Sequence, residues 1–356
     1  MTMPDQMTAL ERLTAYGKGE SVDRLPCVPI VGNGAARILG CKISEFRGNG
    51  NLIAQAHIAA YKRFKYDTVR IFTDLYVLAE AMGATVCYPA DETAHLETPA
   101  LAHINGIERL RPADPSRDGN LPSLLEALEI ARDRVGSEVP VAGAIVCPFT
   151  TALFLIGTDN LIRMTHRDPE GVHRLCEVAL ASALNFAKAV IDLGCSAGLT
   201  EPASSSTIIS PAQFEEFSFP YLKRLTDYIH SRNKPVTLHI CGKTQRIWGL
   251  MADSGADCIS IDEIQDLEIA KHVIGDRVRL MGNVSPAATL LQGTPADVRR
   301  DTLACIRKAH DNPKGLIVAS GCSLPTEVPF ANIQAMVDTV REVGWPVTEE
   351  KLIALA

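Results

Sequence analysis

The sequence predicts an α/β protein that folds as a (β/α)8 barrel of the TIM type. Short apolar segments suited to buried parallel strands alternate with amphipathic helical segments along nearly the whole chain. There are eight such strand segments, the number that closes a barrel of this type. A doubly wound nucleotide-binding sheet is the alternative, but no glycine-rich phosphate loop follows the first strand segment.

The predicted strands are short, apolar and spread over the chain from near its beginning to residue 320. They are residues 27–31, 68–72, 141–146, 197–201, 236–240, 258–262, 279–283 and 316–320. Helical periodicity fills most of the intervals, most clearly at 51–64, 169–194, 211–232, 294–309 and 329–344. Ser210 and Thr294 each precede a proline, which predicts a capped helix start at both places.

Two stretches add to the simple repeat. Residues 2–20 have the pattern of a helix that precedes the first strand, and residues 84–120 form a β-rich insertion after the second βα unit. Barrels with such additions often reach this length as one unit. We therefore expect a single domain over residues 1–356.

Composition excludes several classes of function. Of the 356 residues 46% are hydrophobic and 22% charged, which is typical of a globular protein with a large core. The formal charge of -7 and the scattered lysines and arginines argue against nucleic-acid binding. The start of the chain lacks the pattern of a signal peptide, and no uninterrupted apolar run is long enough for a membrane span. We expect a cytoplasmic protein; its oligomeric state, a homo-oligomer included, is left open.

The ten cysteines include no C-x-x-C pair, so a zinc ribbon or a thioredoxin-like motif has no support. In a reducing compartment we expect most of them to be small core residues. A metal site in this chain must therefore combine residues from distant segments.

Chemically competent side chains follow the predicted strands, at the end where barrel enzymes carry their active sites. These residues are Asp74 after the second strand, Glu201 at the fourth, His239 and Cys241 at the fifth, Asp262 and Glu263 at the sixth, Asn283 at the seventh and Cys322 after the eighth.

His239, Cys241 and Cys322 are a ligand set suited to zinc, with one imidazole, two thiolates and a free fourth position. An isolated H-x-C pair is more often a core histidine beside a buried cysteine. The third thiol, at another strand end in a loop with Gly321 and Pro325, favours the metal site. Three protein ligands and an open position are typical of a catalytic zinc.

The sequence also resembles a known family. The segments "LHICGKT", "ADSGADCISIDE", "RVRLMGNVSP" and "ASGCSLPTEVPFANIQAMV" resemble the zinc-dependent methylcobamide:thiol methyltransferases of the uroporphyrinogen decarboxylase superfamily. Further resemblance in "ERLTAYGKGESVDRLPCVP", "CPFTTALFLIG" and "SPAQFEEFSFPYLKRL" extends it over nearly the whole chain.

The resemblance implies a TIM-like barrel in which His239, Cys241 and Cys322 bind Zn²⁺. It also implies that an acidic residue fills the fourth position when substrate is absent, with Asp262 as the match and Glu263 as the alternative. The expected reaction moves a methyl group between a corrinoid, carried by a partner protein, and a small substrate. That substrate is a thiol such as coenzyme M or, in the reverse direction, a methyl ether that is demethylated.

Two departures from the superfamily bear on the substrate. The decarboxylase branch holds its substrate with an arginine-rich segment after the first strand, whereas "PIVGNGAARILG" has only Arg37. The methyltransferases commonly have an aspartate where this chain has Glu201. Glu201 would either position or protonate a substrate oxygen, or anchor the amides of a loop. A decarboxylase and a non-catalytic protein stabilised by zinc are the alternative functions.

Overall fold

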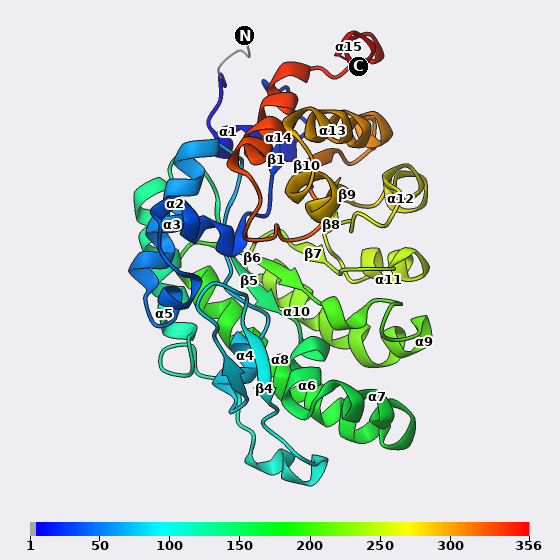
Figure 1. Ribbon diagram of the computed structural model, residues 1–356. Helices are drawn as coiled ribbons and strands as arrows, with labels where there is room; N and C mark the ends of the chain where they lie inside the picture. The colour runs from blue at the N-terminus through cyan, green and yellow to red at the C-terminus, as the bar shows by residue number, and fades with distance from the viewer. Residues whose placement is uncertain (1–4, 356) are drawn as a thin grey trace.

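The computed structural model describes residues 5–355, and it confirms the predicted barrel architecture. Helices surround a curled sheet of eight parallel strands (Figure 1). The strands are β1 (Cys27–Val28), β2 (Val69–Ile71), β5 (Val141–Val146), β6 (Ser196–Thr200), β7 (Thr237–His239), β8 (Cys258–Ser260), β9 (Arg279–Val284) and β10 (Leu316–Ser320). Each observed strand lies within, or extends by one residue beyond, a segment that the sequence predicts.

The strand order is β1-β10-β9-β8-β7-β6-β5-β2, so the first two strands lie at the two edges of the hydrogen-bonded sheet. Asp67, two residues before the start of β2, links these edges. Its backbone amide donates to the carbonyl oxygen of Cys27 over 2.9 Å, and its carboxylate accepts from the Cys27 amide over 2.6 Å. The curled sheet is thus joined to itself at the N-terminal end of β1 and β2.

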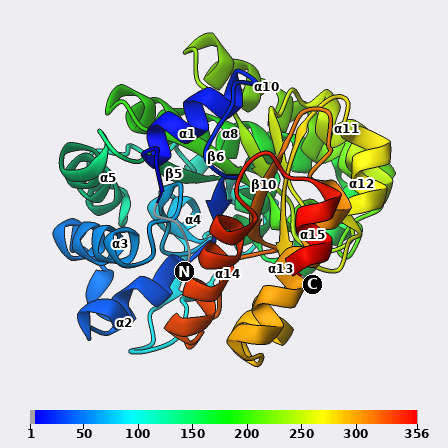
Figure 2. The same ribbon diagram turned by 90° about the horizontal axis from the view of Figure 1, so that it is seen from above.

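The helices lie mostly where periodicity predicts them. They are α1 (Ala9–Gly17), α2 (Ala36–Leu39), α3 (Gly50–Phe64), α4 (Val77–Ala81), α5 (Leu121–Val135), α6 (Pro148–Ile156), α7 (Thr158–Arg167), α8 (Pro169–Asp192), α9 (Pro211–Gln213), α10 (Phe219–Ser231), α11 (Trp248–Asp253), α12 (Leu267–Ile274), α13 (Pro295–Ala309), α14 (Phe330–Val343) and α15 (Glu349–Leu355). Figure 2 shows them arranged around the strands. Within the described residues, no helix has the length and apolar character needed to cross a bilayer.

The predicted helix starts are confirmed. The Ser210 and Thr294 side chains accept hydrogen bonds from the amides of Gln213 and Asp297. The helix expected over 211–232 is interrupted, because a π-helical turn over 214–218 separates α9 from α10. Pro220, in the first turn of α10, has no amide hydrogen and cannot donate the hydrogen bond to the carbonyl oxygen four residues earlier that a continuous α-helix needs. This accounts for the break.

The two predicted additions are present in shorter form. The helix expected over 2–20 is α1, and residues 2–4 of that expectation lie outside the described residues. The insertion contains an antiparallel hairpin of β3 (Thr85–Cys87) and β4 (His95–Thr98), followed by a 3-10 turn over 104–109. Most of residues 84–120 is irregular, so less of the insertion is strand than expected.

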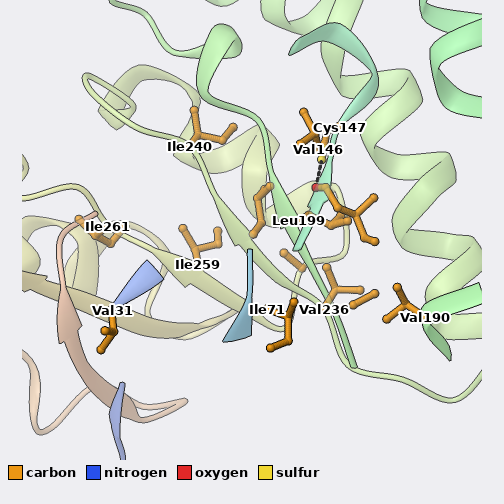
Figure 3. Packing of buried hydrophobic residues seen from close by; sticks show 14 of the residues in the cluster. Val31, Ile71, Val146, Cys147, Val190, Leu199, Val236, Ile240, Ile259 and Ile261 are labelled. Atoms are coloured by element: carbon orange, nitrogen blue, oxygen red, sulfur yellow. Dashed lines mark hydrogen bonds between the residues drawn. The ribbon is translucent and has the colours of Figure 1, made fainter. Parts of the chain in front are cut away.

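Strand residues alternate between the space inside the barrel and the surrounding helices. Outward residues such as Leu199 and Ile259 belong to one large hydrophobic cluster with helix residues such as Val190 of α8 (Figure 3). A smaller cluster fills the barrel interior and comprises Val28, Ile30, Cys258, Met281, Ile317 and Ala319, with Leu13 of α1 packed against it. The large cluster runs from Ala9 to Leu352, which favours the predicted single domain.

Candidate metal centre

The predicted ligands come together at the C-terminal mouth of the barrel. His239 is the last residue of β7, Cys241 follows two residues later, and Cys322 lies two residues beyond the end of β10. Their ligand atoms all lie within 4.8 Å of one another. His239 Nε2 is 3.0 Å from Cys241 Sγ, which is 3.6 Å from Cys322 Sγ. One imidazole and two thiols at these separations fit zinc in both chemistry and spacing.

The imidazole of His239 is held in the orientation that a metal ligand needs. Its Nδ1 lies 3.0 Å from the hydroxyl of Ser260, the neighbouring residue in register on β8, and its Nε2 faces Cys241. A donor hydrogen bond from Nδ1 leaves the Nε2 lone pair free to coordinate. Sequence reasoning missed Ser260, although its place in "CISID", beside the histidine strand, is a signal that could have found it.

The two thiols influence each other's ionisation. The hydrogen bond between them, aided by His239, lowers the pKa of Cys322 to about 4 against the effect of burial. The same hydrogen bond, together with burial, raises the pKa of Cys241. Both thiols are partly exposed at the mouth, whereas His239 is buried. A cation that replaces the shared proton would therefore meet two sulfur ligands already side by side.

Two glycines allow the ligand loops to take these positions. Gly242, directly after Cys241, has φ +77°, a left-handed conformation that favours glycine, and a Cβ there would lie 2.7 Å from the hydroxyl of Thr207. Gly321, directly before Cys322, passes so close to the loop after β8 that a Cβ would lie 2.5 Å from the Glu263 amide nitrogen.

Asp262 lies beside the three ligands without joining their cluster. One oxygen of its carboxylate accepts from the Gly242 amide over 2.7 Å, and the other accepts from the Ile264 amide over 3.1 Å. Burial, with the charge of Asp262, raises the pKa of the neighbouring Glu263. Asn283 donates to the carbonyl oxygens of Asp262 and Gln265 and so fixes this loop. Coordination by Asp262 or Glu263 stays a prediction.

Glu201 is completely buried, and its carboxylate contacts the first turn of α6. It accepts from the backbone amides of Phe149 and Thr150 over 3.2 and 2.7 Å, and also from the hydroxyl of Thr150. Burial raises the pKa of Glu201 to about 7 despite these hydrogen bonds. The contacts favour the expected alternative, a carboxylate that anchors amides, and the catalytic role of Glu201 stays a prediction.

An arginine that sequence reasoning missed also lies inside the barrel. Arg70 of β2 donates from Nη2 to the hydroxyl of Thr200 over 2.6 Å, and Thr200 is the register partner of His239. Burial lowers the pKa of Arg70, whereas the charges of Cys322 and Cys241 raise it. The signal was a charged residue within the otherwise apolar strand "TVRIF".

Asp74 and Arg37 are not part of the cluster formed by the three ligands. Asp74 is buried, accepts from the Tyr76 amide over 2.7 Å, and has its pKa raised by burial to about 6. Arg37 of α2 donates to the carbonyl oxygens of Thr326 and Val328, so its guanidinium is used in fixing a loop.

The chain is similar to known proteins over nearly its whole length. The model of the uroporphyrinogen decarboxylase (URO-D) family matches residues 8–343. The methylcobamide:CoM methyltransferase MtaA of Methanosarcina barkeri is 30% identical over 337 residues, which cover 93% of this chain and 97% of that protein. The methylated-thiol–coenzyme M methyltransferase of Methanosarcina mazei is 26% identical over 348 residues, covering 97% and 92%.

A decarboxylase is also similar, over a shorter stretch. The uroporphyrinogen decarboxylase of Pseudoalteromonas translucida is 25% identical over 304 residues, which cover 83% of this chain. Among solved structures, a methyltransferase from Methanosarcina mazei superimposes with a TM-score of 0.83 at 26% identity, covering 94% of this chain and 98% of that one.

Proposed function

The chain belongs to the uroporphyrinogen decarboxylase family, and we propose that within it the protein is a zinc-dependent methyltransferase that acts between a corrinoid protein and a small thiol. The observation that carries the proposal is the cluster of His239, Cys241 and Cys322 at the barrel mouth, with ligand atoms within 4.8 Å of one another. The similarity to methyltransferases named for methylcobamide and coenzyme M over more than nine-tenths of this chain supports the same activity.

The roles of the residues follow from their positions. His239, Cys241 and Cys322 would hold zinc, and Ser260 would keep the imidazole oriented through its contact with Nδ1. Zinc, when bound, supplies Lewis acidity that lowers the pKa of a substrate thiol and makes it a better nucleophile at neutral pH. The partly exposed cysteines leave the metal-binding cluster accessible to such a substrate from the mouth.

The methyl carrier has to come from a partner, because the chain contains no D-x-H-x-x-G cobalamin-binding signature. Two large apolar side chains lie exposed on the loops that surround the mouth. Ile208, after β6, is 43% exposed, and Ile264, after β8, is 57% exposed. The loop after β7 connects the two loops. Its Lys243 carbonyl oxygen accepts from the Ser206 amide in the loop after β6, and its Gly242 amide donates to Asp262 in the loop after β8. We propose that a corrinoid protein docks over these loops.

The test combines metal analysis with methyl transfer from methylcobalamin to 2-mercaptoethanesulfonate. We expect zinc in the purified protein at about one ion per chain, and we expect Cys241→Ser and Cys322→Ser to lose zinc and at least about 100-fold in transfer. Cys87→Ser, in the hairpin strand β3, is the matched control and should keep both. Unchanged transfer in both site variants would refute the proposal.

The same proteins separate the alternatives. A catalytic zinc predicts that the metal-free protein keeps nearly the same melting temperature, whereas a purely structural zinc predicts a large decrease. Methyl transfer from a methyl ether to cobalt(I), without transfer to a thiol, would assign the reverse direction. Decarboxylation that persists in Cys241→Ser would favour the decarboxylase branch.

A further inference from the structure

We propose that Arg70 is the anion-binding residue of the thiol site, and that it selects acceptor thiols which carry a sulfonate or carboxylate at their other end. The inference rests on the proposed function, because it assigns the second half of the substrate of that same site. Its basis is that the charged guanidinium of Arg70 has a neutral hydroxyl, that of Thr200, as its one hydrogen-bond partner within residues 5–355.

The guanidinium of Arg70 lies inside the barrel, where the neighbouring strands leave room for it. Arg70 is in register with Ala142 of β5, and the next inward positions are Ala144 and its register partner Gly198 of β6. The long side chain passes these small residues and reaches Thr200 at the level of His239. Thr200 and His239 stand on adjacent strands, which lie about 4.8 Å apart. A short ligand can therefore contact both the guanidinium, at Thr200, and the metal-binding cluster, at His239.

Arg70 has hydrogen-bonding capacity that the described residues do not use. A guanidinium has five N–H donors, and here the one recorded side-chain bond is the contact of Nη2 with Thr200. The Nε–H is buried and has no partner within residues 5–355. Such an unsatisfied, buried donor is costly to the fold, which favours a role in binding an acceptor.

A metal in the cluster would not compensate the charge of Arg70. Two thiolates formally neutralise Zn²⁺ and a neutral imidazole adds nothing, while the carboxylate beside the ligands, Asp262, is held by the amides of Gly242 and Ile264. No carboxylate contributes to the ionisation of Arg70, for which the acting charges are those of Cys322 and Cys241. A planar guanidinium matches the oxygens of a carboxylate or a similar anion in geometry as well as in charge.

The experiment compares two thiols of equal chain length, 2-mercaptoethanesulfonate and 2-mercaptoethanol, in wild type, Arg70→Met and Arg70→Lys. We expect wild type to prefer the sulfonate in kcat/KM by roughly ten- to a hundredfold, the worth of a charge-assisted hydrogen bond. Arg70→Met should lose that preference through a higher KM for the sulfonate alone, and Arg70→Lys should retain part of it. Arg134→Met, on the exposed face of α5, is the charge-matched control.

Calorimetric titration with ethanesulfonate, which has no thiol, reads the anion site independently of catalysis. Wild-type protein without added zinc should bind it, and Arg70→Met should not. Equal use of both thiols by wild type, or a loss in Arg70→Met that is equal for both thiols and accompanied by weaker zinc binding, would overturn the assignment. Absence of transfer to either thiol together with Arg70-dependent ethanesulfonate binding would refute the proposed function but not the anion site.

Discussion

The arginines at the two ends of the barrel interior differ in their partners. At the N-terminal end, Arg12 contacts Asp67 and also pairs with Asp23 over 2.6 Å, and Arg24 pairs with Asp67 over 2.6 Å and with Asp5 over 2.8 Å. At the C-terminal mouth, Arg70 has one hydroxyl partner and no paired carboxylate within residues 5–355.

On our proposal for Arg70, the difference separates charges that hold the fold together from a charge that binds substrate. Paired charges at the N-terminal end join α1, the start of β1 and the start of β2, where the two edge strands are not paired along their length and the Asp67 amide bonds to the Cys27 carbonyl oxygen. Breaking such a buried network is costly because it leaves charges without partners. An arginine that is already without a carboxylate contributes little to stability, which is typical of a group kept for binding.

The largest expected effect contrasts the two ends directly. Asp67→Asn should lower the free energy of unfolding by about 3–5 kcal/mol, because it leaves both Arg12 and Arg24 with a neutral partner at a fully buried position. Arg70→Met should change it by less than about 1 kcal/mol, since one hydrogen bond to a hydroxyl and a distant contact with the Phe72 ring are lost while an unsatisfied buried N–H is removed. Denaturant titration of the two variants measures both values, and a larger loss in Arg70→Met would contradict the comparison.

A second prediction concerns the support of the metal ligands. Ser260→Ala removes the hydroxyl beside His239 Nδ1 and should weaken zinc binding by about 10–100-fold with little change in unfolding. Competition with a chelator measures the affinity. Ser254→Ala, which removes a hydroxyl bonded to the Met251 carbonyl oxygen in α11, is the matched control and should leave zinc affinity unchanged.

A third prediction concerns docking at the mouth. Ile264→Asp should raise the KM for a methylated corrinoid protein several-fold, because a charge replaces apolar surface in the proposed contact. The rate with free methylcobalamin should not change. Ile353→Asp on α15, where the isoleucine is 70% exposed, should behave as wild type, and an equal effect of both variants on KM would argue against docking over this loop.

The smallest expected effect is on acid stability. Burial opposes ionisation of Asp23, but the hydrogen bond and charge of Arg12, together with hydrogen bonds from the amides of Met7 and Gln6, outweigh it and lower the pKa of Asp23. The stabilisation is therefore fully present above the unfolded value of about 4 and is lost as the pH falls through the lower native pKa. Asp23→Asn should flatten the decline of stability below about pH 4, and a wild-type curve with no decline there would contradict this assignment.

The sequence was sufficient for the strands and for the three side chains that meet at the mouth, because buried parallel strands are continuous apolar runs and these side chains follow at or near their ends. His239, Cys241 and Cys322 were identified from these positions alone. Arg70 and Ser260 were not, since each lies within a strand, and which strand neighbours which depends on register. Thr200, His239 and Ser260 become neighbours only when β6, β7 and β8 are aligned.

The direction of the Glu201 side chain also could not be predicted from the sequence. Its position at a strand end suggested a group that faces the mouth, but the alternation of side chains along β6 turns Thr200 inward and Glu201 toward α6. A one-residue difference in position decides between the two faces, and the end of a strand does not reveal it without the register of its neighbours.

The most direct test of the account is zinc-edge X-ray absorption of the zinc-loaded protein before and after addition of 2-mercaptoethanesulfonate. We expect two sulfur ligands and one imidazole nitrogen from the protein, and a third sulfur once the thiol is present. A zinc environment without two sulfur ligands, or one that the thiol leaves unchanged, would contradict an open metal centre formed by His239, Cys241 and Cys322.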